Sequence, residues 1–325
     1  MKIIITGATG AFGGAMVRYF FSKGHEIIAV GRTANPPKEL LQMATYLQHD
    51  ICKSYELPEA DLCIHGAALS DDKATEKELF TPNIIGTKNT VLAAQKCKKF
   101  IFISSSSVYL PDPSPITEDM AGNQNNKLLS PYGKSKLDSE EMFKKTFSGE
   151  AGFILRPRAF YGAGDTQIMP RMMRLVKNEV FNKPGSLEIE LSMTHYFNIA
   201  TAIECCMASD LKGIQTYNVA DQETYTMIDT LRALFKVIYK KELSEKKINI
   251  FLLKVLAFFR IAGFTPLLVR ALTQNMVLDI SKIEKELGYK STFTFEESLG
   301  EIGSWVDKIG GAEVLKTGDK TLIWK

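Results

Sequence analysis

The sequence predicts an α/β protein with a doubly wound, parallel sheet of Rossmann type and a smaller, mainly helical C-terminal lobe. Three observations lead to this prediction. Short apolar runs alternate with helix-compatible segments through roughly the first hundred residues, and a glycine-rich turn, GATGAFGG at 7–14, follows the first run. A chain of 325 residues with 45% hydrophobic residues can also bury two cores, so we expect two lobes.

Five apolar runs are expected to be the strands of the sheet. They are KIIIT at 2–6, EIIAV at 26–30, TYLQHD at 45–50, DLCIHGAA at 61–68 and KFIFISSSS at 99–107. The segments 14–23 and 84–97 have helix-compatible patterns and lie between runs. Strand, helix, strand units build parallel sheets, which bind ligands at the carboxyl ends of their strands. The residues directly after each run are therefore candidates for a site.

The glycine-rich turn lies between the first strand and a helix, where a phosphate group is commonly bound. In that interpretation Gly7 allows the tight turn, Gly10 lets the backbone approach a pyrophosphate, and Gly13 allows close packing of helix on strand. Ala11 and Phe12 belong to the same turn and are candidate cofactor contacts. The spacing GxxGxxG differs from the GxGxxG of many dinucleotide sites, and a turn that needs no ligand is the alternative.

Residues after the second and third strands bear on the choice of cofactor. An NAD site usually has an acidic residue after the second strand, which bonds the ribose 2′-hydroxyl. Here that place has Gly31-Arg32, and a guanidinium suits a 2′-phosphate, so we expect NADP in preference to NAD. A solvated loop charge is the alternative for Arg32. Asp50 and its neighbour Ile51 are candidate adenine contacts, although a capping or loop role for Asp50 is an equal alternative.

A tyrosine and a lysine with helical spacing follow the fifth strand. In SPYGKSKLDSEEMF at 130–143, Tyr132 and Lys136 are four residues apart, so a helix places both side chains on one face. An ammonium group beside a phenol favours the phenolate, which makes the tyrosine usable as an acid-base catalyst near neutral pH. Tyr19 and Lys23 have the same spacing, but no hydroxyl-bearing strand end precedes them, so we interpret that pair as structural.

Composition and charge argue against several classes of function. A net charge of +3 with scattered Lys and Arg disfavours a nucleic-acid-binding protein. Five cysteines without CxxC or metal-ligand spacing are expected to be reduced thiols, and we expect no metal site. The first strand follows Met1 and Lys2 at once, with no signal peptide ahead of it, so we expect a cytoplasmic protein.

The apolar stretch 250–268 has the length of a membrane-spanning helix. It is interrupted by Lys254, Arg260, Gly263 and Pro266, so we expect a buried helix or two and no transmembrane segment. A surface for a membrane or for an apolar substrate is the alternative.

The ordered set of motifs resembles the extended short-chain dehydrogenase/reductase family over nearly the whole chain. The matching motifs are TGATGAFG at 6–13, HGAA at 65–68, NIIGTKN at 83–89, SSSSVY at 104–109, YGKSK at 132–136, LRPRAFYGAGD at 155–165, NVAD at 218–221 and ELGYKSTFTFEESL at 286–299. The segments 164–178 and 191–203 are similar to those of hydroxysteroid-dehydrogenase-like and dihydroflavonol-reductase-like members, which often act on hydrophobic alcohols or ketones. Those members usually have Asp before Asn198, where this chain has Phe197.

The resemblance implies a catalytic set and a cofactor site. Ser105 would bond the substrate oxygen, Tyr132 would donate or accept the proton, and Lys136 would bind the nicotinamide ribose while tuning Tyr132. A serine satisfied by the backbone is the alternative for Ser105. Further cofactor contacts fall on Ala67, Ala68, Asn83 and Pro157. Many relatives dimerise through the helix that has the Tyr/Lys pair, here 131–147, so we expect a homodimer.

Chemistry within the family divides into three classes. Dehydratases have Asp-Glu after the strand-end hydroxyl, where this chain has Ser106-Ser107, so dehydration is disfavoured. We therefore expect hydride transfer between NADP(H) and a carbonyl or secondary alcohol of a hydrophobic small molecule. A nucleotide-sugar epimerase with tightly held NAD is an alternative, for which Arg171, Arg174 and Lys177 are available to bind a substrate pyrophosphate. A dinucleotide-binding regulator without catalysis is the other alternative, and the Tyr/Lys pair argues against it.

This interpretation divides the chain into two parts. We expect an NADP-binding domain at 1–163, with a return segment near 192–222, and a substrate-binding lobe at 164–325. His195 lies in the return segment, and we leave it out of the catalytic set because a lone histidine is more often a packed residue.

Overall fold

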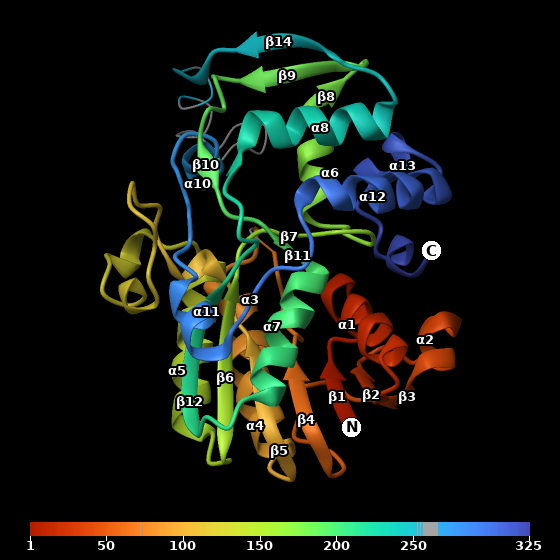
Figure 1. The fold of residues 1–325 in the computed structure, drawn as a ribbon, viewed down its shortest axis with the longest axis vertical. Helices are drawn as coiled ribbons and strands as arrows, with labels where there is room; N and C mark the ends of the chain where they lie inside the picture. The colour runs from red at the N-terminus through yellow and green to blue at the C-terminus, as the bar shows by residue number, and fades with distance from the viewer. Residues whose placement is uncertain (72, 252, 254, 256–265) are drawn as a thin grey trace.

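The central layer is a seven-stranded sheet in which every neighbouring pair of strands is parallel (Figure 1). A computed structural model describes residues 1–71, 73–251, 253, 255 and 266–325. The strand order is β12-β6-β5-β4-β1-β2-β3. The strands are β1 (Lys2–Thr6), β2 (Glu26–Gly31), β3 (Thr45–Gln48), β4 (Ala60–His65), β5 (Cys97–Ile103), β6 (Ala151–Pro157) and β12 (Gly213–Val219). Because the chain builds outward from β1 in both directions, the predicted doubly wound α/β fold is confirmed.

The five predicted strands all occur, and three of them, β3, β4 and β5, end earlier than the apolar runs do. β4 ends at His65 and β5 at Ile103, so the small and polar residues that follow them lie in loops at the carboxyl edge of the sheet. After β5 the chain leaves the sheet through a single 3-10 turn, η2 (Ser106–Val108). The helix expected over 84–97 is α4 (Gly86–Ala93), which follows a π-helical turn, η1 (Phe80–Ile85).

Helices cover both faces of the sheet, so alternate strand residues enter two different cores. On one face, Ile3 and Ile5 of β1 lie in a cluster with residues of α1 (Ala11–Ser22) and α7 (Tyr196–Ala208). On the other face, Ile4 lies in a cluster with residues of α4 and α5 (Pro131–Thr146). A strand buried on both faces needs a continuous apolar sequence, which explains the run of isoleucines.

A second lobe lies beyond the carboxyl ends of the strands (Figure 1). Its small sheet has the order β14-β9-β8, and its core includes Phe181, Phe235 and Trp305. The elements of this part are α6 (Ile168–Met173), β8 (Val176–Lys177), β9 (Val180–Pro184), α8 (Met227–Tyr239), β14 (Ser244–Ile248), α10 (Pro266–Ala271), α12 (Phe295–Ile309) and α13 (Ala312–Lys316). The remaining short elements are α2 (Lys38–Met43), α3 (Glu76–Leu79), β7 (Phe160–Tyr161), β10 (Glu190–Leu191), β11 (Thr194–His195), β13 (Tyr225–Thr226) and α11 (Ser281–Leu287).

A buried carboxylate, Asp221, ties together the segments that cross between the sheet and the second lobe. It accepts hydrogen bonds from the backbone N–H of His195 (2.9 Å), the side-chain amide of Asn198 (2.6 Å) and the hydroxyl of Tyr161 (2.6 Å). Asn198 also binds the backbone of residues 292 and 293 on both sides of its amide. The segment around Phe197 therefore connects β7 and α7 with residues 292 and 293.

The expected buried helix over 250–268 falls largely outside the described residues. Among the residues that the structure does describe, no helix is long and apolar enough to cross a membrane.

A short 3-10 segment, η6 (Lys320–Trp324), packs against the glycine-rich turn at the other end of the sequence. The indole N–H of Trp324 donates to the carbonyl of Thr9 (3.2 Å), and the Arg18 guanidinium lies 4.9 Å from the centre of the indole ring. A Cβ at Gly14 would lie 2.9 Å from the same ring. The first turns of α1 are therefore held in place by residues more than three hundred positions away.

Candidate active site

The glycine-rich turn joins β1 to α1 through two close backbone contacts. Gly7 has φ of +73°, and a Cβ there would lie 2.9 Å from the Cα of Ala67. A Cβ at Gly13 would lie 2.2 Å from the carbonyl oxygen of Gly7. Both positions need glycine for the fold itself, because no side chain has room there.

Gly10 differs from these two glycines, because the protein leaves it room. A Cβ at Gly10 would meet only the Gly7 carbonyl oxygen, at 3.3 Å. Gly10 is the N-cap of α1, no side chain caps the helix, and no acidic residue lies in its first turn. A helix N-terminus in this state attracts an anion. The turn, with Ala11 and Phe12, therefore fits the pyrophosphate of a dinucleotide.

The loops after β2 and β3 place Arg32 near Asp50. Arg32 is exposed, while the carboxylate of Asp50 accepts the N–H of Cys52 (3.0 Å). That hydrogen bond is the main cause of the lowered pKa of Asp50, and Arg32 contributes less. Ile51 is tied to α4, since its carbonyl accepts the side-chain amide of Asn89 (2.9 Å) and its side chain lies against Gly86. The loop role weighed for Asp50 is thus present, and its carboxylate stays at the carboxyl edge of the sheet.

Asn83 is a buried link between the loop after β4 and α5. Its side-chain oxygen accepts the N–H of Leu69 (2.7 Å), and its amide nitrogen donates to the Leu69 carbonyl (3.1 Å) and to the Ser135 hydroxyl (2.9 Å). In the same loop, the N–H of Ala67 donates to Thr6 Oγ1 (3.3 Å), and Ala68 is exposed. These bonds hold residues 67–69 beside the glycine-rich turn.

The serine turn after β5 packs directly against the first turn of α5. α5 begins with Ser130 as its side-chain cap and Pro131 at its first position. A Cβ at Gly133 would lie 2.0 Å from the carbonyl oxygen of Ser107, so only glycine permits this approach. Ser105 is almost buried, and its hydroxyl donates to Ser107 Oγ (3.0 Å) and accepts the N–H of Ser107 (3.1 Å). The local satisfaction weighed for Ser105 is therefore present in this structure.

Tyr132 and Lys136 lie one helical turn apart on α5, next to this serine turn. Lys136 is 3% exposed, and its Nζ donates to the carbonyl of Ile103, the last residue of β5 (2.7 Å). Nζ also lies 4.5 Å from the centre of the Phe102 ring. Burial lowers the pKa of Lys136 to about 7, and Glu140 opposes that change. Tyr132 is partly exposed. The structure thus brings Ser105, Tyr132 and Lys136 to one edge of the sheet.

A buried ion pair lies behind this edge, and sequence reasoning did not identify it. The Arg156 guanidinium binds the Glu140 carboxylate at two points, 2.9 Å and 2.6 Å, and Ser104 Oγ donates to the same carboxylate (2.5 Å). Arg156 also donates to the hydroxyl of Tyr109 (2.7 Å), which donates to Asn218 (2.7 Å). Glu140 lies one turn after Lys136, so the YxxxKxxxE spacing is the signal that was available.

Two histidines, His65 and His195, and the second Tyr/Lys pair have structural surroundings. His65 is fully buried between the hydroxyls of Thr6 and Thr87, and burial lowers its pKa to about 3, with Lys136 contributing. His195 lies 2.9 Å from the Glu301 carboxylate and is buried. The phenol of Tyr19 donates to Glu204 (3.0 Å), and burial raises its pKa to about 12, with Glu204 adding to the rise. A phenolate is therefore disfavoured at Tyr19.

No group of three or more His, Cys, Asp or Glu side chains that could hold a metal ion is present within the described ranges.

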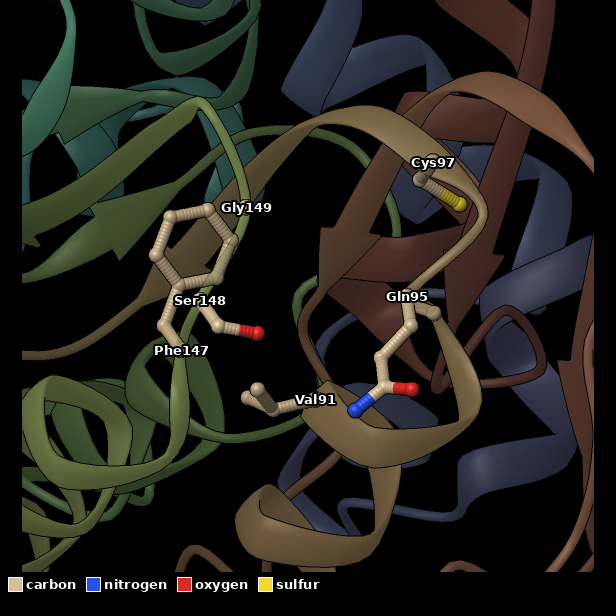
Figure 2. Close-up of a pocket in the computed structure, with 7 residues that line it drawn as sticks. Val91, Gln95, Cys97, Phe147, Ser148 and Gly149 are labelled. Carbon is tan, nitrogen blue, oxygen red and sulfur yellow. The ribbon is translucent and has the colours of Figure 1, made fainter.

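A cavity of about 280 Å³ lies at the opposite edge of the sheet (Figure 2). It is lined by the end of α4 and the turn after it, by the first residue of β5, and by the segment between α5 and β6, including Val91, Gln95, Cys97, Phe147 and Ser148. Dinucleotides bind at the carboxyl ends of the strands in such sheets. This cavity at the amino edge is therefore separate from the candidate active site.

Comparison with known proteins places the chain in one protein family. The family model of the NAD dependent epimerase/dehydratase family matches residues 3–220. The chain is 23% identical to a 3-beta-hydroxysteroid dehydrogenase of Mycolicibacterium neoaurum, over 92% of this chain and 90% of that protein. It is 28% identical to a UDP-glucose 4-epimerase of Vibrio cholerae, over 92% of this chain and 93% of that protein.

A solved structure shows the same fold. The UDP-glucuronic acid 4-epimerase of Bacillus cereus, in complex with NAD, has a TM-score of 0.73 and 19% identity, and the match covers 95% of this chain and 99% of that one. The matched family model, which covers more than half of the chain, identifies the protein as a member of the NAD dependent epimerase/dehydratase family, within the extended short-chain dehydrogenases/reductases, and so as an NAD(P)-dependent enzyme.

Proposed function

We propose that the protein transfers a hydride between NADP(H) and a carbonyl or secondary alcohol of a hydrophobic small molecule. The observation that supports this most is the contact of Gly133 with the Ser107 carbonyl, which sets the Tyr132 turn of α5 against the Ser105 turn. These two turns hold a hydroxyl, a phenol and an ammonium group at the carboxyl edge of the sheet. That set is sufficient for acid-base catalysis on an oxygen atom.

In the proposed reaction each side chain has one role. When bound, the nicotinamide supplies or takes up the hydride. The Ser105 hydroxyl donates a hydrogen bond to the substrate oxygen, and Tyr132 gives its phenolic proton to that oxygen in reduction or removes it in oxidation. The positive charge of Lys136 stabilises the phenolate of Tyr132, and its ammonium group binds the nicotinamide ribose.

We assign cofactor binding to residues 1–163 with the return segment near 192–222, and substrate binding to 164–325. The proposed cofactor contacts are Gly7, Gly10, Ala11, Phe12, Gly13, Arg32, Asp50, Ile51, Ala67, Ala68, Asn83, Tyr132, Lys136 and Pro157. NADP is preferred in this proposal because exposed Arg32, and no carboxylate, directly follows β2. The neighbouring carboxylate of Asp50 opposes a 2′-phosphate.

We also propose that the protein works in the cytoplasm as a homodimer that uses the face around α5. The neighbouring elements expose two large apolar side chains, Phe80 at 51% and Leu92 at 44%. Light scattering on the purified protein tests this point, since a monomeric mass at micromolar concentration would contradict it.

The proposed chemistry is tested with Tyr132→Phe. This variant keeps its fold and its cofactor affinity, whereas turnover of a ketone panel with NADPH falls by at least about a hundredfold, because the proton donor is gone. Unchanged turnover on any substrate of the wild-type protein would remove Tyr132 from the mechanism.

The same preparations test the cofactor and the epimerase alternative. Titration with NADPH and NADH by intrinsic fluorescence, repeated on Arg32→Ala, is expected to show tighter NADPH binding that the substitution abolishes. Equal or tighter NADH binding would contradict the NADP preference. NAD that co-purifies and does not exchange would favour a nucleotide-sugar epimerase, for which exposed Arg171, Arg174 and Lys177 stay candidate pyrophosphate ligands. Binding without turnover of any substrate would favour the regulator.

A further inference from the structure

Two arginines lie two residues apart at the end of β6, and their surroundings differ. Arg156 is paired, since the Glu140 carboxylate, the Tyr109 hydroxyl and the Glu118 carbonyl accept its hydrogen bonds. The Nε of Arg158 is buried and has no hydrogen-bond partner. Its guanidinium forms no ion pair with any residue in the part of the chain that the structure describes.

The Arg158 side chain is half-buried, and burying part of an unpaired guanidinium costs the folded protein free energy. Removing a charge from water without a partner disfavours folding, so buried charges are normally paired or bound to a ligand. Burial alone lowers the pKa of Arg158 to about 10, and no carboxylate raises it. Arg158 therefore keeps its positive charge at neutral pH, and the described residues supply no anion to balance it.

The backbone at Arg158 is fixed in place. Its N–H donates to Thr194 Oγ1 (3.0 Å), and its carbonyl accepts from the same hydroxyl (2.8 Å), which belongs to a fully buried side chain. The next residue, Ala159, has φ of +44°, a region that residues with a Cβ rarely adopt. The position of Arg158 is thus set by the fold before any ligand binds.

Arg158 lies at the same edge of the sheet as Ser105, the proposed ligand of the substrate oxygen. β5 and β6 are paired, with Ile103 opposite Leu155, and the N–H of Ser104 donates to the Leu155 carbonyl (2.7 Å), so the residues that follow both strands lie at the same edge of the sheet. Arg158 follows Pro157 directly at the carboxyl edge of the sheet, where the second lobe begins. A group bound by Arg158 therefore lies close to a substrate whose oxygen Ser105 binds.

We propose that Arg158 binds an anionic group of the substrate, a carboxylate or a phosphate. The inference rests on the proposed function, which places the substrate at this edge. A guanidinium whose Nε–H has no partner in the protein has two parallel N–H donors on that side, and these match the two oxygens of a carboxylate or phosphate. The substrate then combines a ketone or alcohol, an apolar body and an anionic end.

A binding experiment tests this without turnover. Thermal unfolding of the full chain with NADP⁺ is measured with octanoate, octyl phosphate and 1-octanol, which share one apolar chain and differ in the head group. We expect octanoate or octyl phosphate to raise the unfolding temperature, the stronger of the two identifying the anion, and 1-octanol to do less. In Arg158→Gln the difference between the anions and the alcohol disappears. Equal responses of the two proteins would overturn the proposal.

Stability and cofactor affinity separate an anion-binding role from a structural one. Arg158→Gln without ligand is expected to unfold at the same or a higher temperature than the wild type, because an unpaired charge is removed. The matched variant Arg156→Gln unfolds at a lower temperature, since it leaves Glu140 unpaired. A large loss of stability in Arg158→Gln, or a tenfold loss of NADPH affinity, would assign Arg158 to the fold or to the cofactor and overturn the proposal.

Turnover then distinguishes a failure of this inference from a failure of the proposed function. For 3-oxooctanoate and its methyl ester, the wild-type ratio of kcat/KM is expected to favour the acid at least tenfold, and Arg158→Gln to remove that preference. If neither ketone is reduced while the anions still protect only the wild type, the anion site stands and the proposed reaction needs revision. Reduction of both ketones with the same ratio in both proteins would overturn the anion site alone.

Discussion

Lys136 is a buried charge whose environment makes stability depend on pH. The unfolded chain keeps this proton up to a pKa of 10.5, whereas the folded protein releases it near pH 7. Between these values folding releases a proton, so the contribution of Lys136 to stability rises with pH and is lowest below pH 7, with a slope of at most about 1.4 kcal/mol per pH unit.

Lys136→Met should therefore flatten the pH dependence of stability. Unfolding by urea at pH 7 and pH 9 is expected to show that the wild type gains stability relative to Lys136→Met as the pH rises, because only the wild type has this proton to release. The control is Lys134→Met on the same helix. Lys134 is exposed, and its hydrogen bond to Glu76 (2.7 Å) raises its pKa, so it is charged in both states at both pH values. Parallel profiles for wild type and Lys136→Met would contradict the assignment.

Among single residues, the sequence predicted the candidate site residues that belong to local motifs. It missed the residues whose importance depends on partners far away in the sequence. Tyr132 and Lys136 are recognisable because their spacing puts them on one helix face and a serine-rich strand end comes before them, which Tyr19 and Lys23 lack. Glu140 and Arg156 look like ordinary charged residues until the fold sets α5 against β6 and buries both. The lack of a hydrogen-bond partner for Arg158 Nε likewise depends on the folded surroundings, and the sequence LRPRAF does not predict it.

The first turn of α5 is the element on which the site depends most. Gly133→Ala would force its Cβ into the Ser107 carbonyl, so α5 must move away from the serine turn. Overpacking of this kind costs roughly 1–3 kcal/mol. We expect a lower free energy of unfolding together with a lower kcat, because the phenol and the Ser105 hydroxyl separate.

Gly300→Ala is the matched control. Gly300 lies inside α12, is exposed, and has no atom within 4 Å of the place where a Cβ would stand. Because alanine loses less conformational freedom in a helix, this variant should gain up to about 1 kcal/mol of stability and keep its kcat. Urea unfolding and steady-state turnover measure both variants, and a Gly133→Ala protein as stable and active as the wild type would refute the close contact.

The strands of the central sheet could be predicted where a single apolar run corresponds to a single strand. The five expected strands exist because a sheet covered on both faces needs unbroken apolar runs. The strands β4 and β5 stop short of the runs because the small residues after His65 and the serines after Ile103 turn away toward the site. The π-helical turn η1, which has the sequence FTPNII, was not predicted from the sequence.

For the whole molecule, the contact between η6 and the glycine-rich turn predicts a spectroscopic effect. The chain has two tryptophans, and only Trp324 bonds the turn, whereas the Trp305 N–H donates to the Leu322 carbonyl (3.4 Å). Binding of NADPH should change the tryptophan emission of the wild type and of Trp305→Phe, but not that of Trp324→Phe. Loss of the hydrogen bond to Thr9 should also weaken cofactor binding on the order of fivefold. A full emission change in Trp324→Phe would show that the turn and η6 are independent.

The contact between Trp324 and Thr9 also has a consequence for folding. It closes a loop of 315 residues, so forming it costs the unfolded chain nearly as much conformational entropy as any single contact in this protein can. Local contacts such as β1 with α1 can form early, but a contact of this sequence separation must wait until both lobes have condensed. The glycine-rich turn, although it comes first in the sequence, therefore reaches its final packing among the last parts of the molecule. A refolding chain should regain helical and sheet structure before it regains full affinity for the dinucleotide.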